Sequence, residues 1–197
     1  MSVPFDHHEL PLAAAVRLAV RGGGVLGAAL LLSAAPAMAA VDLTEYSDFG
    51  QADILLTAAS IVQSGDGHIA LIDQTIDGGG IGNIAHVDQS GATNVAYVTQ
   101  TGDLNRARVV QSDSDNLATI TQTGIGNSID VLQSGMGNQL NGLQQGDGNV
   151  ATITQSGNSH ITFAEIGNNN ILNISQPSSG VPVAVFINGN GVTVTQL

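Results

Sequence analysis

A glutamine recurs every eleven residues through the middle of the chain, and this repeat limits the possible folds more than any other feature. Between Gln89 and Gln122 three units follow one another: QSGATNVAYVT, QTGDLNRARVV and QSDSDNLATIT. Their pattern is Gln-x-Gly-x-x-Asn-x-Ala-x-Val/Ile-x, with an aspartate for the glycine in the third unit. From the asparagine to the next glutamine, the shared residues occupy every second position and therefore point to one face of a β-strand. The four residues between glutamine and asparagine suit a tight turn. Each unit thus predicts a seven-residue strand and a four-residue turn, and so short a repeat indicates a solenoid.

The repeat extends over most of the chain. Glutamines keep the eleven-residue step from Gln63 to Gln155, except that the loop 75–82 lengthens one step to fifteen. Beyond Gln155 the pattern weakens, and further strands are predicted at 159–165, 170–176, 181–187 and 190–196. With a first strand at 57–63, thirteen strands are predicted. The predicted fold is all-β: a two-sheet β-solenoid over residues 57–197 with 22 residues per coil, in which odd and even strands form opposite parallel sheets.

Inward amides are expected to stack into hydrogen-bonded ladders along the solenoid and to bond turn backbone groups that would otherwise be buried without partners. The predicted ladder residues are Asn83, Asn94, Asn105, Asn116, Asn127, Asn138, Asn149 and Asn170, with Gln63, Gln74, Gln89, Gln100, Gln111, Gln122, Gln133, Gln144, Gln155, Gln176 and Gln196. The predicted turn glycines are Gly65, Gly91, Gly102, Gly124, Gly135 and Gly146. The predicted core residues, which would fill a thin space between two close sheets, are Ala96, Val98, Ala107, Val109, Ala118, Ile120, Ile129, Val131, Ala151 and Ile153.

Composition narrows the classes of function. The chain has no cysteine, a formal charge of −12 and only four basic residues, all arginine. An acidic chain without a basic patch argues against a nucleic-acid partner. We predict no catalytic site, no small-molecule substrate, no cofactor and no metal. His68 is expected at an asparagine ladder position, whereas His86 and His160 are expected to point outward.

Aspartate and threonine side chains on the outer faces, and one glycine-rich loop, allow alternative interpretations. Outward Asp73, Asp88 and Asp130 are expected either to oppose side-by-side packing of fibres or to be ordinary solvated positions. Outward Thr-x-Thr pairs at 119/121 and 152/154 raise the alternative of a monomeric secreted solenoid binder, of the adhesin or ice-binding type. The glycine-rich loop 78–83 raises a weaker alternative, a calcium-binding β-roll.

The N-terminal region has the features of a secretory leader. Arg17 and Arg21 precede an apolar run at 25–35, and residues 37–39 read Ala-Met-Ala, which is typical of a cleavage site. The run is shorter than the roughly 20 residues that a membrane span needs. We therefore predict a signal peptide at 1–39, a non-repeat segment at 40–56 and the solenoid at 57–197.

The two ends of such a solenoid expose unpaired backbone groups that can template another chain. The sequence shows no polar helix or proline-rich cap before the first strand, and the last segment, VTVTQL, is strongly β-forming. We therefore expect both ends to be open and the chain to polymerise end to end into a cross-β fibre.

The repeat resembles that of the curlin family, the subunits of curli. The family pattern, Gln-x-Gly-x-x-Asn-x-Ala-x-x-x-Gln, occurs here in three full copies, which open at Gln89, Gln100 and Gln144. The resemblance covers about residues 57–196. It implies secretion through an outer-membrane pore, followed by assembly with other curlin subunits into a functional amyloid that serves adhesion and biofilm. Asp113 in place of glycine, His68 in place of asparagine and Ile187 in place of glutamine depart from the pattern. Major and nucleator subunit types both remain open.

Overall fold

The computed structural model describes residues 15–21, 40–43, 57–76, 81–177 and 180–197. All of the regular secondary structure in these ranges is β-strand, and the predicted all-β fold class is confirmed. The expected leader and the segment 40–56 therefore lie largely outside the described residues. Within the described part of the chain, no helix is long and apolar enough to cross a membrane.

Thirteen strands form the repeat array, β3 to β15, as the sequence predicts. The strands in the described ranges are β1 (Ala15–Arg21), β2 (Ala40–Leu43), β3 (Ala58–Asp66), β4 (Ile69–Thr75), β5 (Ile84–Ala92), β6 (Val95–Asp103), β7 (Arg106–Gln111), β8 (Leu117–Ile125), β9 (Ser128–Ser134), β10 (Gln139–Gln145), β11 (Val150–Ser156), β12 (His160–Ile166), β13 (Ile171–Gln176), β14 (Val183–Asn188) and β15 (Thr193–Gln196).

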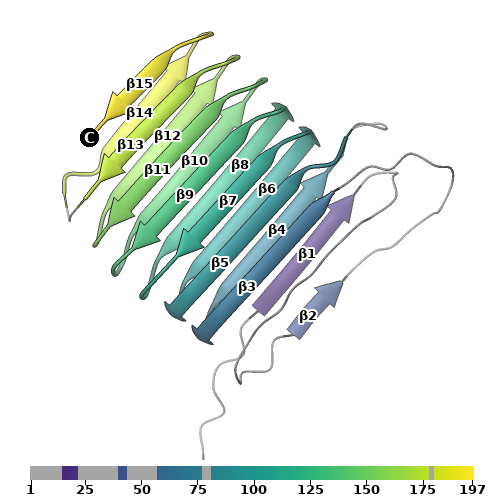
Figure 1. The fold of residues 1–197 in the computed structure, drawn as a ribbon, viewed down its shortest axis with the longest axis vertical. Helices are drawn as coiled ribbons and strands as arrows, with labels where there is room; N and C mark the ends of the chain where they lie inside the picture. Colours follow the sequence, from purple (N-terminus) through teal and green to yellow (C-terminus); the bar gives the residue numbers. More distant parts are fainter. Residues whose placement is uncertain (1–14, 22–39, 44–56, 77–80, 178–179) are drawn as a thin grey trace, which may run out of the picture.

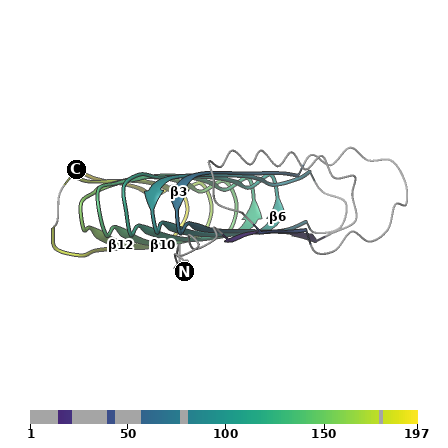
Figure 2. The same cartoon turned by 90° about the horizontal axis from the view of Figure 1, so that it is seen from below.

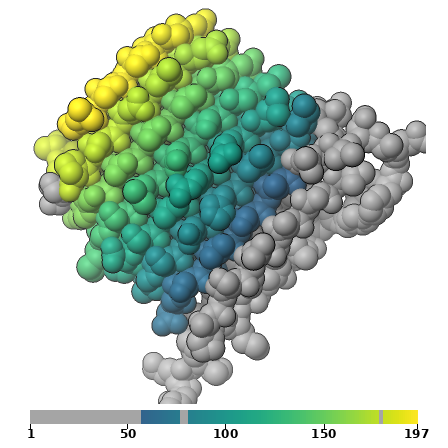
Figure 3. Space-filling view, viewed as in Figure 1, coloured from purple at the N-terminus to yellow at the C-terminus, as the bar shows by residue number. Residues whose placement is uncertain are grey.

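Consecutive strands of the array alternate between two parallel sheets. Sheet A contains the even-numbered strands β4 to β14, and sheet B contains the odd-numbered strands β3 to β15. Each strand pairs with the strand two further along the chain, so that Gln89 lies opposite Gln111 and Gln111 opposite Gln133. The stack is a flat solenoid of two layers joined by turns (Figures 1 and 2). Its successive strands form a continuous surface on the face seen in Figure 3.

The space between the sheets is filled by small and branched side chains. All ten predicted core residues are at most 1% exposed. The largest buried side chain is Phe163 on β12. It fits because its neighbour on β10 is Gly142, where an added Cβ would lie 2.6 Å from the phenyl Cε1 atom. Gly142 stands where other strands of the sheet have valine or isoleucine. Because glycine has no side chain, the phenyl ring of Phe163 fills the space that a side chain at residue 142 would occupy.

The last strand lies in a different register from the predicted one. Ile174 of β13 faces Gln196 of β15, and Leu172 faces Val194. Val192, not Asn190, therefore takes the asparagine position, and its backbone N–H donates to Asn170 Oδ1 at 3.1 Å. The prediction assigned residue 190 to the asparagine position because it is an asparagine. In the structure, the residue at that position follows Val181 by eleven residues, as elsewhere in the repeat, and is therefore Val192. Gln196 is exposed and is not a ladder residue, which corrects its assignment.

The N-terminal edge of sheet A also differs from the prediction of two open ends. The backbone of β1 pairs in parallel with β4, from Ala15 opposite Ile69 to Arg21 opposite Thr75. β2 pairs in turn with β1 (Figure 1). A free strand edge accepts any β-forming segment that can reach it, and the valine-containing sequence of β1 is such a segment. The remaining terminal strands are β3 and β15 in sheet B and β14 in sheet A.

The turn glycines are required by two separate constraints. Each of the six predicted ones has a positive φ angle, between +80° and +120°. In addition, the turns of successive coils approach closely: a Cβ on Gly124 would lie 2.1 Å from the carbonyl oxygen of Gly146. A side chain at such a position is therefore opposed both by the backbone angle and by the next turn.

These two constraints can be separated by two substitutions in one turn. Gly124→Ala meets both of them, whereas Gly126→Ala meets only the backbone angle, because Gly126 has φ +68° and open space around its Cβ position. We expect Gly126→Ala to lower the free energy of unfolding by about 1 kcal/mol and Gly124→Ala by about 2–4 kcal/mol. Urea titration of the β-structure signal measures both values. Equal losses would show that the close approach of the turns does not constrain the residue.

Candidate functional site

Two glutamine ladders run through the interior, one along each sheet. In sheet B, the side-chain Nε2 of each glutamine donates to Oε1 of the next, over Gln63, Gln89, Gln111, Gln133 and Gln155, at 2.7–2.9 Å. In sheet A, the same bonds join Gln74, Gln100, Gln122 and Gln144 at 2.7–2.9 Å. All these side chains are at most 3% exposed. The ladders are therefore buried chains of side-chain hydrogen bonds parallel to the stacking axis.

The ladder glutamines from Gln74 to Gln155 also join the two sheets. The second Nε2 hydrogen of Gln122 on sheet A donates to the backbone carbonyl of Arg106 on sheet B at 3.0 Å, and Gln133 bonds Leu117 in the same way. The accepting carbonyl belongs to the residue sixteen positions earlier, or twenty for Gln89 because of the inserted loop, where the preceding strand begins. The amide thus satisfies a backbone group at the turn that would otherwise lack a partner, as expected from the repeat.

Asparagines form a second pair of ladders at the other ends of the strands. Asn105 Oδ1 accepts from both the backbone N–H and Nδ2 of Asn127, at 3.1 and 3.0 Å. Asn127 Nδ2 also donates to the carbonyl of Gly146 in the turn of the next coil, at 2.7 Å. The predicted asparagines, Asn83, Asn94, Asn105, Asn116, Asn127, Asn138, Asn149 and Asn170, are all at most 1% exposed. Four of them, Asn94, Asn105, Asn116 and Asn127, each bond a carbonyl of their own turn and a carbonyl of the turn stacked on it.

A match to a known family rests on this same unit. Residues 80–112, which run from the inserted loop through β5 and β6 to β7, match the family described as the curlin associated repeat. The chain carries the curlin repeat. No curated protein and no solved structure matches the chain. The glutamine, glycine and asparagine positions of the curlin repeat are thus the positions that build the ladders and turns described above.

His68 replaces asparagine in the curlin repeat without breaking the ladder. Its ring is fully buried, and Nδ1 accepts from the backbone N–H of Asn94 at 3.3 Å. The other ring nitrogen lies 3.1 Å from the carbonyl of Ser64, to which it can donate. The imidazole ring therefore replaces the asparagine amide at both contacts. His86 and His160 lie on outer faces, as the sequence predicts.

Asp113 replaces a turn glycine, and the turn keeps its conformation and its hydrogen bond to the ladder. Its φ angle is +70°, in the left-handed region that aspartate tolerates better than most residues. Its Oδ2 accepts from the backbone N–H of Gly135, one coil further on, at 2.8 Å. Its carbonyl still accepts from Asn94 Nδ2 at 3.0 Å, as the glycine carbonyl does in other units. The substitution keeps the ladder contact and adds a hydrogen bond between coils.

Glu165 replaces the fifth glutamine of the sheet A ladder and changes its chemistry. Gln144 Nε2 donates to Glu165 Oε2 at 2.6 Å, but Oε1 is buried and has no partner. A carboxylate can only accept, so the ladder cannot continue through it. The residue stacked on it, Ile187, is apolar. Burial raises the pKa of Glu165 from 4.5 to about 7, and the hydrogen bond from Gln144 opposes this shift.

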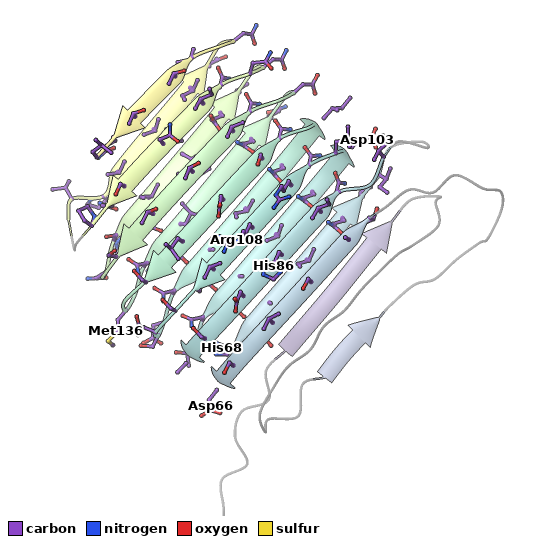
Figure 4. The ribbon with its side chains drawn as sticks, in the orientation of Figure 1. Asp66, His68, His86, Asp103, Arg108 and Met136 are labelled. Atoms are coloured by element: carbon purple, nitrogen blue, oxygen red, sulfur yellow. The ribbon has the colours of Figure 1, made fainter. Side chains whose placement is uncertain are left out.

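The outer faces carry a few charged side chains. On sheet B, Arg108 Nη1 lies 3.0 Å from Asp130 Oδ1, and His86 occupies the same row on β5 (Figure 4). Both partners of the ion pair are about half exposed, so its contribution to stability is small. Asp130 is therefore paired, which weakens the reading of it as a free repelling charge. Among the described residues, no group of three or more His, Asp or Glu side chains could hold a metal; residues 77–80 of the glycine-rich loop lie outside them.

The two ends of the array expose different ladder chemistry. At the N-terminal end, the buried Oε1 atoms of Gln63 and Gln74 have no hydrogen-bond partner. From Gln89 to Gln155 in sheet B and from Gln100 to Gln144 in sheet A, the equivalent atom accepts from the glutamine of the coil before it. The Oε1 atoms of Gln63 and Gln74 therefore lack the donor that a preceding glutamine would supply. Gln176 Oε1 is also buried without a partner, so Gln176 does not continue the ladder, which corrects its assignment. At the C-terminal end, Val181, Ile187 and Val192 stand where earlier coils have amides.

The Glu165 carboxyl makes the stability of the solenoid pH-dependent. Because its pKa is higher in the folded state than in the unfolded chain, the stabilisation is complete below the unfolded value of 4.5. It is lost as the pH rises through about 7. Glu165→Gln removes this dependence, so the variant should exceed the parent chain in unfolding free energy by roughly 2–3 kcal/mol at about pH 8 and by little at about pH 4. Urea titrations of both chains at the two pH values give the difference, which must grow with pH if the carboxyl is buried as described.

Interruption of a ladder should cost more than the loss of one surface amide. Gln122→Met leaves Gln144 Oε1 and the carbonyl of Arg106 without donors, and we expect it to lower the unfolding free energy by about 2–4 kcal/mol. Gln145→Met is the matched control, because Gln145 is exposed on the same strand as Gln144; its effect should stay within about 0.5 kcal/mol. Similar losses in the two variants, measured by urea titration, would argue against the ladder as a source of stability.

Proposed function

We propose that this chain is a structural subunit of an extracellular functional amyloid fibre, of the curli type, which polymerises end to end and serves cell-surface adhesion and the biofilm matrix. The observation that carries the proposal is that the curlin repeat forms a stack whose hydrogen-bonding pattern is not completed within one chain. Strands β3, β14 and β15 are terminal in their sheets. Gln63 and Gln74 each present a buried amide oxygen without a donor.

The addition of another coil would pair these open strand edges at little conformational cost. A strand placed on β14 or β15 repeats a pairing that the array already makes many times, with backbone hydrogen bonds and an apolar inner face. The end coil is also incompletely buried, because Val183, Val185 and Val194 only partly pack against the core. Covering them removes apolar surface from water, which favours association.

The N-terminal strands add a condition to this proposal. β1 lies within the expected leader, residues 1–39, and occupies the edge of sheet A beside β4. β2 is attached to the sheet through β1. Removal of the leader would take β1 away, leave β2 without its partner and free the edge of β4. In this proposal, secretion and leader cleavage therefore precede the opening of the N-terminal end.

The proposed partners follow from the same family. Other curlin subunits would add to either end, and an outer-membrane pore would export the chain; the extracellular location is part of this proposal. A major subunit and a nucleator differ in whether they start fibres alone. The irregular coils that contain His68, Asp113 and Glu165 fit either role.

Fibre growth tests the proposal directly. The chain that begins at Ala40 is expected to form fibres after a concentration-dependent lag, followed by thioflavin fluorescence, with a meridional reflection at about 4.7–4.8 Å. The full 1–197 chain should elongate more slowly, because β1 covers one strand edge. Growth without a lag would indicate a nucleator, and growth that depends on preformed fibres would indicate a major subunit.

A soluble monomer with fixed β-structure at all concentrations would contradict the fibre proposal and favour the monomeric binder. The arrangement of the threonine pairs gives that alternative little support. Thr119 and Thr121 lie on β8 in sheet A, whereas Thr152 and Thr154 lie on β11 in sheet B. The two pairs therefore face opposite sides of the solenoid and do not form one regular surface.

A further inference from the structure

The number of strands in the array is odd, and this parity constrains how two copies can meet. Each step along the chain moves from one sheet to the other, so β3 and β15 both lie in sheet B. Sheet B therefore has seven strands of the array, and sheet A has six, β4 to β14. After β15, the next free place along the path of the solenoid is in sheet A, beside β14.

A second copy that continues this path begins with β3, a strand of its own sheet B. We propose that successive copies in the stack are related by a half-turn about the stacking axis, so that β3 of each copy pairs with β14 of the copy before it and β4 pairs with β15. This inference rests on the proposed function, in which the arrays stack end to end, and it specifies the geometry of the junction.

The half-turn is compatible with the directions of the strands. All strands within one sheet are parallel, and the path reverses direction between the sheets, since each turn leads from one sheet to the other. Rotation by half a turn about the stacking axis exchanges the two sheets and reverses the strand direction at the same time. The second copy's strands are therefore parallel to those they join. The operation repeats the relation between each strand of the array and the next.

In the chain that has lost the leader, and with it β1, a junction without the half-turn leaves a place empty. If sheet B of the second copy continued sheet B of the first, β3 would pair with β15, but β4 would lie two strand spacings from β14, about 10 Å away. The outer edge of β14 would then keep its unpaired backbone groups inside the fibre, where water cannot fully replace the lost partner strand. Each such group costs about 1–3 kcal/mol, so a vacancy along a six-residue strand is strongly disfavoured.

The inner faces that meet in the half-turn are both apolar at their centres. By the register of the repeat, Ala59 of β3 would face Val183 of β14, and Ile61 would face Val185. At the ends of the strands, Gln63 would face Ile187. The junction would therefore be joined by backbone hydrogen bonds and apolar contact, without the glutamine pairs that join coils inside each copy.

Cysteine cross-linking across the junction tests the half-turn, because the chain has no cysteine of its own. Ser60, Ala184 and Thr195 occupy the same outward row on β3, β14 and β15, by the pairings of the array. The variants are S60C/A184C and S60C/T195C, treated in assembled fibres with a thiol cross-linker that spans about 8 Å, longer than one strand spacing and too short to pass around a two-sheet stack. Both are made in the full 1–197 chain and exported from bacterial cells, so that the fibres contain the chain as cells process it.

The half-turn predicts a covalent ladder of dimers, trimers and longer products on a denaturing gel for S60C/A184C, and monomer for S60C/T195C. The reverse result would overturn it in favour of direct continuation, since Ser60 of one copy would then adjoin Thr195 of the other. Fibres in which neither pair cross-links would also overturn it. The single variants S60C, A184C and T195C must give monomer, which excludes contacts between fibres.

The same experiment separates this inference from the proposed function. If no fibres with a cross-β reflection form, the proposed function fails and the half-turn fails with it. If fibres form, helical reconstruction should give a rise of about 31 Å per copy, thirteen half-spacings of about 2.4 Å, with a half-turn between copies. A rise that corresponds to a whole number of full spacings, with no rotation, would contradict the half-turn alone.

Discussion

The structure depends on the hydrogen bonding of amide side chains that are removed from water. A buried carboxamide without partners is costly, and this interior contains one at nearly every strand end. Stacking removes the cost, because in the regular coils a glutamine or asparagine finds its partner in the identical residue of the next coil. The same requirement explains the parallel register, the constant 22-residue coil and the small core residues. A shift by one residue would turn every amide outward and every valine with it.

The interruptions of the ladders are therefore more informative than the regular units. His68 reproduces the hydrogen bonds of the asparagine that it replaces, and Asp113 keeps the ladder contact of a glycine and adds a bond between coils. Glu165, in contrast, accepts one ladder bond and donates none. Beyond Glu165 the amides of sheet A are replaced by Ile187 and Val181. The array thus changes along its length, from coils joined by side-chain hydrogen bonds to a terminal coil joined mainly by backbone pairing and apolar contact.

Much of this architecture could be predicted from the sequence, because period-two spacing and the glutamine step are local and repeated many times. The number of strands, the two sheets and the inward residues follow from them. Three features could not be predicted in this way. The register of β15 is predicted wrongly because Asn190 has the amide side chain expected at a ladder position. The eleven-residue step of the repeat leads from Val181 to Val192 instead. The pairing of β1 with β4 joins segments about 50 residues apart in the chain and has no counterpart in the repeat. The packing of Phe163 against Gly142 can be recognised only when the sequences of neighbouring coils are aligned. The glycine at a position that otherwise holds valine or isoleucine is the sequence feature that indicates it.

The donor directions of the two kinds of ladder have a consequence for broken fibres. Glutamine oxygens face the preceding coil, while asparagine Oδ1 atoms face the following one, as the bonds of Gln122 to Gln144 and of Asn127 to Asn105 show. A break between any two regular coils therefore creates two unlike surfaces. One exposes glutamine oxygens and the other exposes glutamine N–H groups, with the asparagine groups reversed. Two surfaces of the same kind can meet only when one fragment is inverted, which makes the paired strands antiparallel and sets glutamine positions against asparagine positions. The ladders of identical residues are therefore restored only when fragments rejoin in their original direction.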